Sequence, residues 1–167
     1  MRTIALAFAF LAVAACGDDS GNNDMGVALN GVVVNEVFAQ GPSGAMPDWA
    51  ELKNVSDKEA DLSGWKVRDK DPADLFVLPP GTTIAAKGYL LIYCDDQVDG
   101  GVSGGIHVPW KLSANNGDEF HLVSPGGIDV DATTFPAGIA VDSSWGRLPD
   151  GTGNFTTMTP TPGKANY

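Results

Sequence analysis

Short apolar runs alternate with turn-forming residues from residue 32 onward, and several runs show the period-two pattern of a half-buried strand. Around residue 50, for example, Ala50 and Leu52 alternate with aromatic or charged neighbours, which places the two sets on opposite faces of a strand. The predicted strands are Val32–Phe38, Trp49–Asn54, Trp65–Arg68, Leu75–Leu78, Tyr89–Cys94, His107–Leu112, Glu119–Val123 and Ala132–Phe135.

Clusters of glycine, proline, asparagine and aspartate separate these runs. Asn116-Gly117 suits a tight hairpin, because both residues tolerate positive φ. After the N-terminal region, no stretch of ten or more residues carries a helical stripe. Many short strands with regular turns predict an all-β fold, an antiparallel sandwich or barrel.

The first sixteen residues have a different texture. Arg2 precedes an apolar run of thirteen residues that ends at Ala15, and Cys16 follows. As a helix this run spans about 20 Å, short of a hydrocarbon core of roughly 30 Å, so we expect an export signal. The string Val13-Ala14-Ala15-Cys16 resembles the lipobox of bacterial lipoproteins, which implies cleavage before Cys16 and its acylation. The alternative is an ordinary cleaved signal peptide with a structural Cys16.

We therefore expect three parts: a lipoprotein signal peptide (1–15), a lipidated cysteine with a flexible acidic linker (16–30), and a β-sandwich domain (31–167). The linker is too polar to offset its ordering entropy. Several acyl chains on Cys16 give a lasting anchor, since each buried methylene contributes about 0.8 kcal/mol. By analogy with enteric lipoproteins, aspartate directly after the cysteine favours the inner membrane. Gly17 takes that place here, so we expect the outer membrane.

The chain is acidic, with a formal net charge of −11. Removal of residues 1–15 takes away only Arg2 from ten basic residues, which leaves a net charge of −12. Nucleic-acid binding requires clustered Lys and Arg, so no nucleic-acid partner is expected. Lipidation leaves Cys94 as the remaining thiol, and its apolar run predicts a buried cysteine that acts as a small hydrophobic side chain.

Several motifs stand in a familiar order. They are Val33-Val34-Asn35-Glu36-Val37, Asp48-Trp49-Ala50-Glu51-Leu52-Lys53-Asn54, Asp61-Leu62-Ser63-Gly64-Trp65, Pro79-Pro80-Gly81-Thr82-Thr83-Ile84, Gly88-Tyr89-Leu90-Leu91-Ile92, Lys111-Leu112-Ser113, Gly117-Asp118-Glu119, Ser144-Trp145-Gly146-Arg147-Leu148-Pro149-Asp150-Gly151 and Pro160-Thr161-Pro162-Gly163-Lys164-Ala165-Asn166. From about Val32 to Tyr167 this series resembles the bacterial lamin-tail domain. The resemblance implies an immunoglobulin-like β-sandwich with an adhesion or tethering role.

Two acidic stretches are candidate Ca²⁺ sites, because oxygen ligands at short spacing suit this ion. The alternative for both is a solvated loop, since their spacing closes no coordination shell. The first stretch contains Asp95, Asp96 and Asp99, and the second Asp69, Asp71 and Asp74.

Other residues have alternative interpretations. Glu36 and Glu51 form either a paired-carboxylate site or structural positions, which face outward or accept hydrogen bonds from loops. Trp110 either stacks on a sugar ring or lies in the core. We expect Arg147 to stack on an aromatic ring or pair with an acid. No motif spacing supports zinc binding by His107 and His121.

The sequence thus predicts a membrane-anchored lipoprotein whose non-catalytic domain binds a protein or cell-envelope component. A carbohydrate- or calcium-binding surface module is the alternative. A hydrolase is the more distant one, because no histidine falls in the context of a catalytic motif.

Overall fold

The computed structural model describes residues 30–39, 47–97 and 105–167. The expected signal peptide, Cys16 and most of the linker lie outside these residues. Within the described ranges, every regular element is a strand. The strands are β1 (Val32–Phe38), β2 (Asp48–Asn54), β3 (Ala60–Asp61), β4 (Lys66–Arg68), β5 (Phe76–Val77), β6 (Thr83–Ile84), β7 (Tyr89–Cys94), β8 (Ile106–Val108), β9 (Asp118–Val123), β10 (Asp129–Phe135), β11 (Ser144–Leu148) and β12 (Asn154–Met158).

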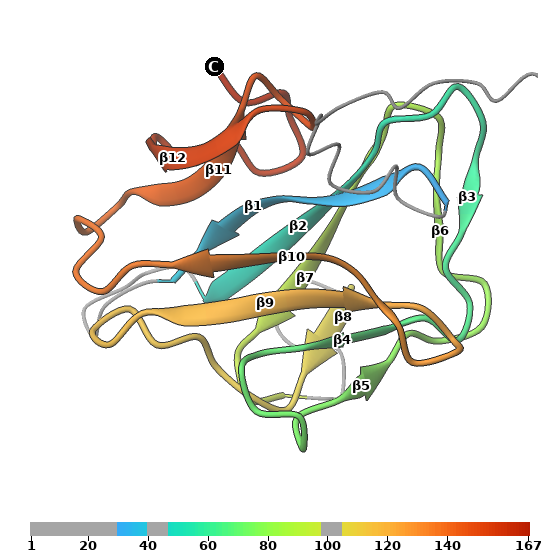
Figure 1. Cartoon of the computed structure of the whole chain (residues 1–167), viewed down its shortest axis with the longest axis horizontal. Coiled ribbons are helices and arrows are strands. Elements are labelled where there is room, and N and C mark those ends of the chain that lie inside the picture. Colours follow the sequence, from blue (N-terminus) through green and yellow to red (C-terminus); the bar gives the residue numbers. More distant parts are fainter. Residues whose placement is uncertain (1–29, 40–46, 98–104) are drawn as a thin grey trace, which may run out of the picture.

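Two sheets pack face to face (Figure 1). The larger sheet has the order β12-β11-β1-β2-β7-β8, the smaller sheet has the order β10-β9-β4-β5, and β3 pairs with β6 separately. Paired strands are antiparallel apart from β7 and β8, which run parallel. The predicted all-β class and immunoglobulin-like sandwich are confirmed.

The hydrophobic core lies between the two sheets, where Leu52 of the larger sheet and Phe120 of the smaller sheet are fully buried. Trp65 belongs to this core and follows a turn in which the Ser63 N–H donates to Asp61 Oδ1. Trp49 is also buried, but it lies on the other face of the larger sheet and stacks on Phe38. Strand alternation explains this, because Leu52 and Trp49 are three positions apart along β2 and therefore point to opposite faces.

The structure corrects the strand prediction near the C-terminus. The predicted strand His107–Leu112 is replaced by β8, which ends at Val108. β11 and β12 were not predicted, because glycine and threonine interrupt their apolar pattern. Asn116-Gly117 lies in the turn before β9 rather than between two paired strands.

Candidate functional site

A β-bulge gathers polar side chains on the outer face of the larger sheet. The pairing of β1 with β2 runs from Val34↔Leu52 to Glu36↔Glu51, so Asn35 is an extra residue. A bulge directs two successive side chains to one side. It therefore keeps Val34 and Val37 in the core while Asn35 and Glu36 both face Glu51. We call these three residues, Asn35, Glu36 and Glu51, the carboxylate clamp.

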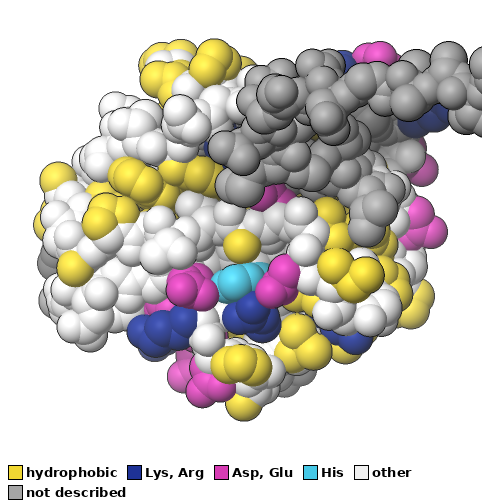
Figure 2. Space-filling model, viewed as in Figure 1, with side chains coloured by type: hydrophobic (Ala, Val, Ile, Leu, Met, Phe, Trp, Pro, Cys, Tyr) yellow, Lys and Arg dark blue, Asp and Glu magenta, His cyan; other side chains and the backbone are white. Residues whose placement is uncertain are grey.

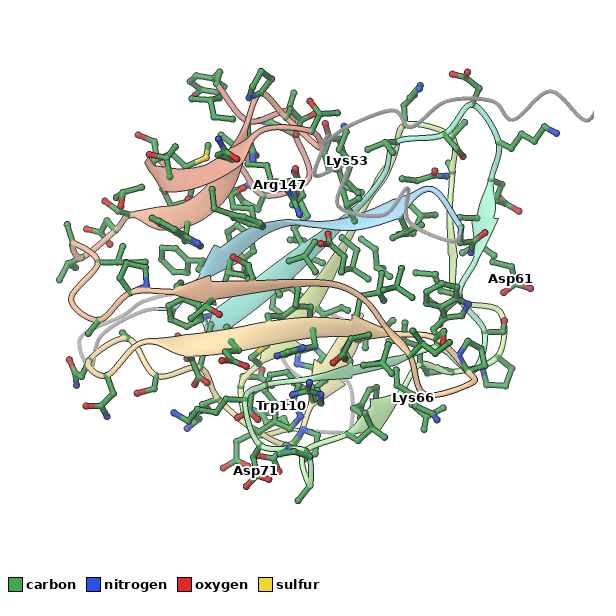
Figure 3. The ribbon with its side chains drawn as sticks, viewed as in Figure 1. Lys53, Asp61, Lys66, Asp71, Trp110 and Arg147 are labelled. Atoms are coloured by element: carbon green, nitrogen blue, oxygen red, sulfur yellow. The ribbon has the colours of Figure 1, made fainter. Side chains whose placement is uncertain are left out.

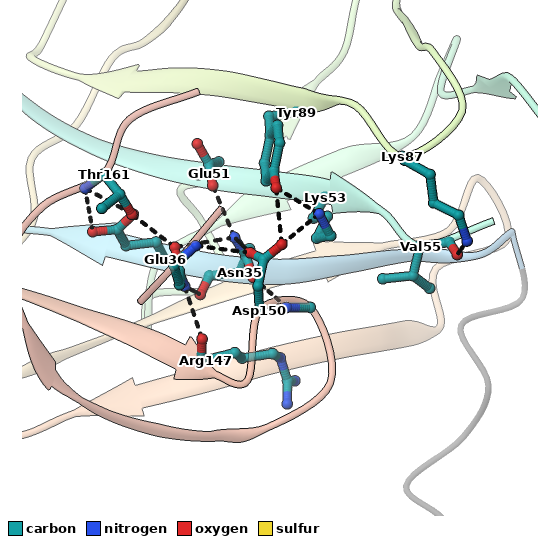
Figure 4. Close-up of polar contacts among 12 residues, drawn as sticks. Asn35, Glu36, Glu51, Lys53, Val55, Lys87, Tyr89, Arg147, Asp150 and Thr161 are labelled. Carbon is teal, nitrogen blue, oxygen red and sulfur yellow. Dashed lines mark hydrogen bonds and ion pairs between the residues drawn. The ribbon is translucent and has the colours of Figure 1, made fainter. Parts of the chain in front are cut away.

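Residues 159–167 cross the clamp and are called here the C-terminal strap (Figure 4). Glu36 is fully buried and accepts hydrogen bonds from the Thr161 N–H at 3.1 Å and from the Ser144 hydroxyl. Burial raises the pKa of Glu36, although the Ser144 and Thr161 hydrogen bonds oppose this effect.

The Thr161 hydroxyl lies 2.9 Å from Glu36 Oε2 and 2.8 Å from Asn166 Oδ1. A hydroxyl has one proton, so it donates to only one of these oxygens. Both contacts become hydrogen bonds when Glu36 is protonated and donates to Thr161.

Glu51, also fully buried, lies directly opposite Glu36 in the strand register. It accepts hydrogen bonds from Asn35 Nδ2 at 2.9 Å and from the Gly163 N–H at 2.6 Å. Burial raises the pKa of Glu51 from its usual 4.5 to about 7, and Glu36 adds to the effect by charge repulsion.

An ion pair closes one end of the clamp. Lys53 Nζ lies 2.6 Å from Asp150 Oδ2, and the Tyr89 hydroxyl donates to the same oxygen at 2.8 Å. Asn35 Nδ2 donates to the other carboxylate oxygen at 3.0 Å. Burial acts to raise the pKa of Asp150, but the hydrogen bonds from Lys53, Tyr89 and Asn35 outweigh it and the net pKa is lowered. Asp150 therefore stays ionised beside the clamp.

Asn166 anchors the far end of the strap. Its Nδ2 donates to the Arg147 carbonyl at 2.9 Å and to the Asn35 carbonyl at 3.4 Å. Gly146 makes this approach possible, since a Cβ there would lie 2.9 Å from Asn166 Nδ2 and 3.2 Å from Glu36 Cγ. The glycine in β11 is thus required by close packing.

Arg147 behaves as predicted. Its guanidinium lies 4.5 Å from the centre of the Phe155 ring and contacts both carboxylate oxygens of Asp131 at 3.0 Å. Its Nε donates to the Val34 carbonyl at 2.8 Å. Arg147 therefore ties β11 to β1 and β10.

His121 lies in a charged row on the outer face of the smaller sheet. Figure 2 shows a histidine between acidic side chains there. Arg68 Nη2 lies 2.9 Å from His121 Nδ1 and 3.0 Å from Asp129, and His121 Nε2 lies 2.8 Å from Glu119. Because a guanidinium only donates, His121 Nδ1 accepts and Nε2 carries the proton.

The first calcium candidate does not form one site among the described residues. Asp95 is nearly buried and lies 2.8 Å from His107 Nδ1, whereas Asp96 is exposed. Asp99 lies outside the described residues. No group of three metal-ligating residues forms in the described part of the chain.

In the second calcium candidate, two of the aspartates serve local turns. Asp69 is buried and its Oδ1 accepts the Asp71 N–H at 2.6 Å, while Asp71 Oδ1 accepts the Ala73 N–H at 2.9 Å. Burial raises the pKa of Asp69. The side chain of Asp71 projects from the edge of the molecule (Figure 3).

The structure overturns the sugar-stacking interpretation of Trp110. Only 5% of Trp110 is exposed, and it packs in the core with its ring centre 6.1 Å from that of Phe120 (Figure 3). A sugar ring has no free face of Trp110 to stack on. The core alternative is the correct one, since Trp110 belongs to the core cluster together with Val108 and Leu112.

Cys94 is fully buried, as predicted. Burial raises the pKa of its thiol well above the usual value, and Asp48 and Asp95 add to this. The side chain therefore acts as a small hydrophobic residue.

The roles of Asn35, Thr161 and Asn166 were not predicted from the sequence. One signal was available for Asn35: the core-facing alternation of β1 changes phase between Val34 and Val37, which indicates a bulge. No local pattern indicates that residues 161–166 lie on Glu36 and Glu51.

The arrangement holds a chain segment by hydrogen bonds. No helix within the described residues has the length and apolar character needed to cross a membrane.

The family model described as Lamin Tail Domain matches residues 27–137, about two thirds of the chain. No curated protein matches the chain. The match includes the carboxylate clamp and ends before the C-terminal strap.

Proposed function

The chain belongs to the lamin tail domain family, and we propose that it is a non-catalytic, membrane-anchored module. A lipid on Cys16 holds it at the bacterial cell envelope, and its immunoglobulin-like domain binds another protein or an envelope component. The outer membrane is the proposed location, since Gly17 follows Cys16.

One observation carries the non-catalytic part of this proposal. Glu36 and Glu51 are the most enzyme-like pair of the chain, because two neighbouring carboxyl groups are a common acid–base arrangement. Both are fully buried, and Thr161 and Gly163 of the strap donate to them. While the strap is in place, a substrate has no access to these carboxylates, because their oxygens accept hydrogen bonds from the chain's own backbone.

The anchor rests on the register of the N-terminal residues. A short apolar run, two small residues and Cys16 follow one another in the order that lipoprotein processing requires. The acidic linker after Cys16 then separates the domain from the membrane surface.

Replacement of Cys16 tests the anchor. The Cys16→Ser chain should no longer incorporate a labelled fatty acid and should be found outside the membrane fraction. The matched control is Cys94→Ala, which changes the other cysteine. It should leave fatty-acid incorporation and membrane localisation unchanged. Membrane retention and labelling of Cys16→Ser like the wild type would refute the anchor.

Two measurements test the domain's role. Crosslinking of the acylated protein in its native envelope, followed by mass spectrometry, should recover a specific partner that a Cys16→Ser chain does not reach. Failure to recover one counts against the interaction role. Hydrolase activity of the purified chain that disappears in Glu51→Gln would overturn the non-catalytic assignment.

A further inference from the structure

The C-terminal strap is held by polar contacts and contributes nothing to the core between the sheets. The core cluster of described residues contains no member of residues 159–167. The strap is held instead through Thr161, Gly163 and Asn166, while Lys164, Ala165 and Tyr167 are exposed. Release of the strap therefore uncovers the polar clamp and leaves the apolar core closed.

Each clamp side chain also has a hydrogen-bond partner outside the strap. Ser144 of β11 donates to Glu36, and Asn35 donates to Glu51. The Gly151 N–H donates to Asn35 Oδ1 at 2.9 Å, and Asp150 accepts from Asn35 Nδ2. Each clamp side chain is thus positioned by a neighbour within the sheet or in the loop between β11 and β12.

The strap also carries its own conformation. The Lys164 N–H donates to the Thr161 carbonyl at 3.0 Å, and Gly163 has a φ of 73°. Proline at the second position and a glycine with positive φ at the third are the signature of a type II turn. This turn presents the Thr161 and Gly163 N–H groups to Glu36 and Glu51 at a low entropic cost.

We propose that the carboxylate clamp is a peptide-binding site for segments with the spacing Thr-x-Gly-x-x-Asn, and that the strap of a second copy of the chain enters it in exchange for the chain's own. Exchange of an identical segment keeps every contact and adds a link between copies. This proposal goes beyond the anchoring role and does not depend on it.

A cleavable strap tests the binding site. An exposed protease recognition sequence is inserted after Thr159, the chain is cleaved, and a fluorescent peptide of residues 159–167 is added. The cleaved protein should stay folded and exchange its strap for the labelled peptide. Unfolding on cleavage would show that the strap is integral to the fold and would overturn the proposal.

Matched peptides test the recognition. Peptides with Thr161→Val or Asn166→Ala should bind at least about tenfold more weakly, because each loses buried hydrogen bonds to the clamp. A peptide with Lys164→Ala, which changes an exposed position, should bind like the wild type. Equal binding of the Asn166→Ala and wild-type peptides would refute recognition by the clamp.

Two full-length variants test whether a second copy of the chain supplies the strap. Asn166→Ala weakens the strap and leaves the clamp side chains unchanged, whereas the Cβ of Gly146→Ala would lie 2.6 Å from Met158 Sδ and 2.9 Å from Asn166 Nδ2 and should weaken binding of a strap to that clamp. A mixture should form heterodimers in native mass spectrometry, and neither variant alone should dimerise. Peptide exchange without heterodimers would overturn the second copy as the occupant.

Discussion

Replacement of Glu51 by glutamine isolates the titration of the clamp, because the side chain keeps its shape and loses its charge. In the folded chain, burial raises the pKa of Glu51 from 4.5 to about 7. The folded state therefore binds this proton more tightly than the unfolded state. The stabilisation that this bound proton gives the folded state is complete below about pH 4.5 and is lost as the pH rises through about 7.

The magnitude follows from the two pKa values. One pH unit corresponds to about 1.4 kcal/mol, so the wild type should lose about 3 kcal/mol of unfolding free energy from this group between about pH 4 and pH 8. Glu51→Gln cannot titrate and should not show this part of the loss. The cost of the substitution should therefore be largest at low pH and fall by about 3 kcal/mol as the pH rises.

Urea unfolding followed by tryptophan fluorescence, at several pH values, measures this difference. The glutamine amide faces the Gly163 N–H and adds a constant cost, so the test is the slope with pH. The control Glu59→Gln changes an exposed carboxyl group and should leave the slope unchanged. A cost of Glu51→Gln that is constant with pH would refute the raised pKa of the buried Glu51 carboxyl group.

Three further results are expected. Leu52→Ala should lower the unfolding free energy by about 2–5 kcal/mol in urea titrations, because it leaves a cavity between the sheets; a cost below about 1 kcal/mol would contradict its core position. Arg147→Lys should cost about 1–3 kcal/mol in the same assay, since the single nitrogen of lysine cannot bind both Asp131 and the Val34 carbonyl; an unchanged midpoint would argue against that role. Cys94 should react with a thiol reagent only at the rate of global unfolding, because burial raises its pKa, and rapid labelling of the native chain would disprove this.

The strands with a clean local pattern were predictable. Tyr89–Cys94 has the same bounds in the sequence prediction and in the structure, because its apolar run is bounded by glycine and aspartate. The turn before Trp65 was also predictable, because Asp61 and Ser63 are close in the sequence and form a hydrogen bond with each other. These features depend on neighbours in the sequence.

The two tryptophans show where this reasoning stops. Trp49 and Trp110 are both buried, and their size made burial the simple expectation. Trp49 nevertheless lies on the outer face of the larger sheet. Trp110 lies in the core, although the sequence had left sugar stacking open as an alternative for it. Local alternation separates two faces of a strand, but it does not say what covers each face.

The sequence by itself determined the all-β class, most of the strands of the sandwich and the burial of Cys94, because these follow from hydrophobic period and turn chemistry. Only the tertiary structure decided the role of Glu36 and Glu51. Their partners Thr161 and Gly163 are 125 and 112 residues away in the chain. Whether a buried carboxyl group is a reactive site or a clamp depends on which donors reach it, and the packing of distant segments supplies those donors.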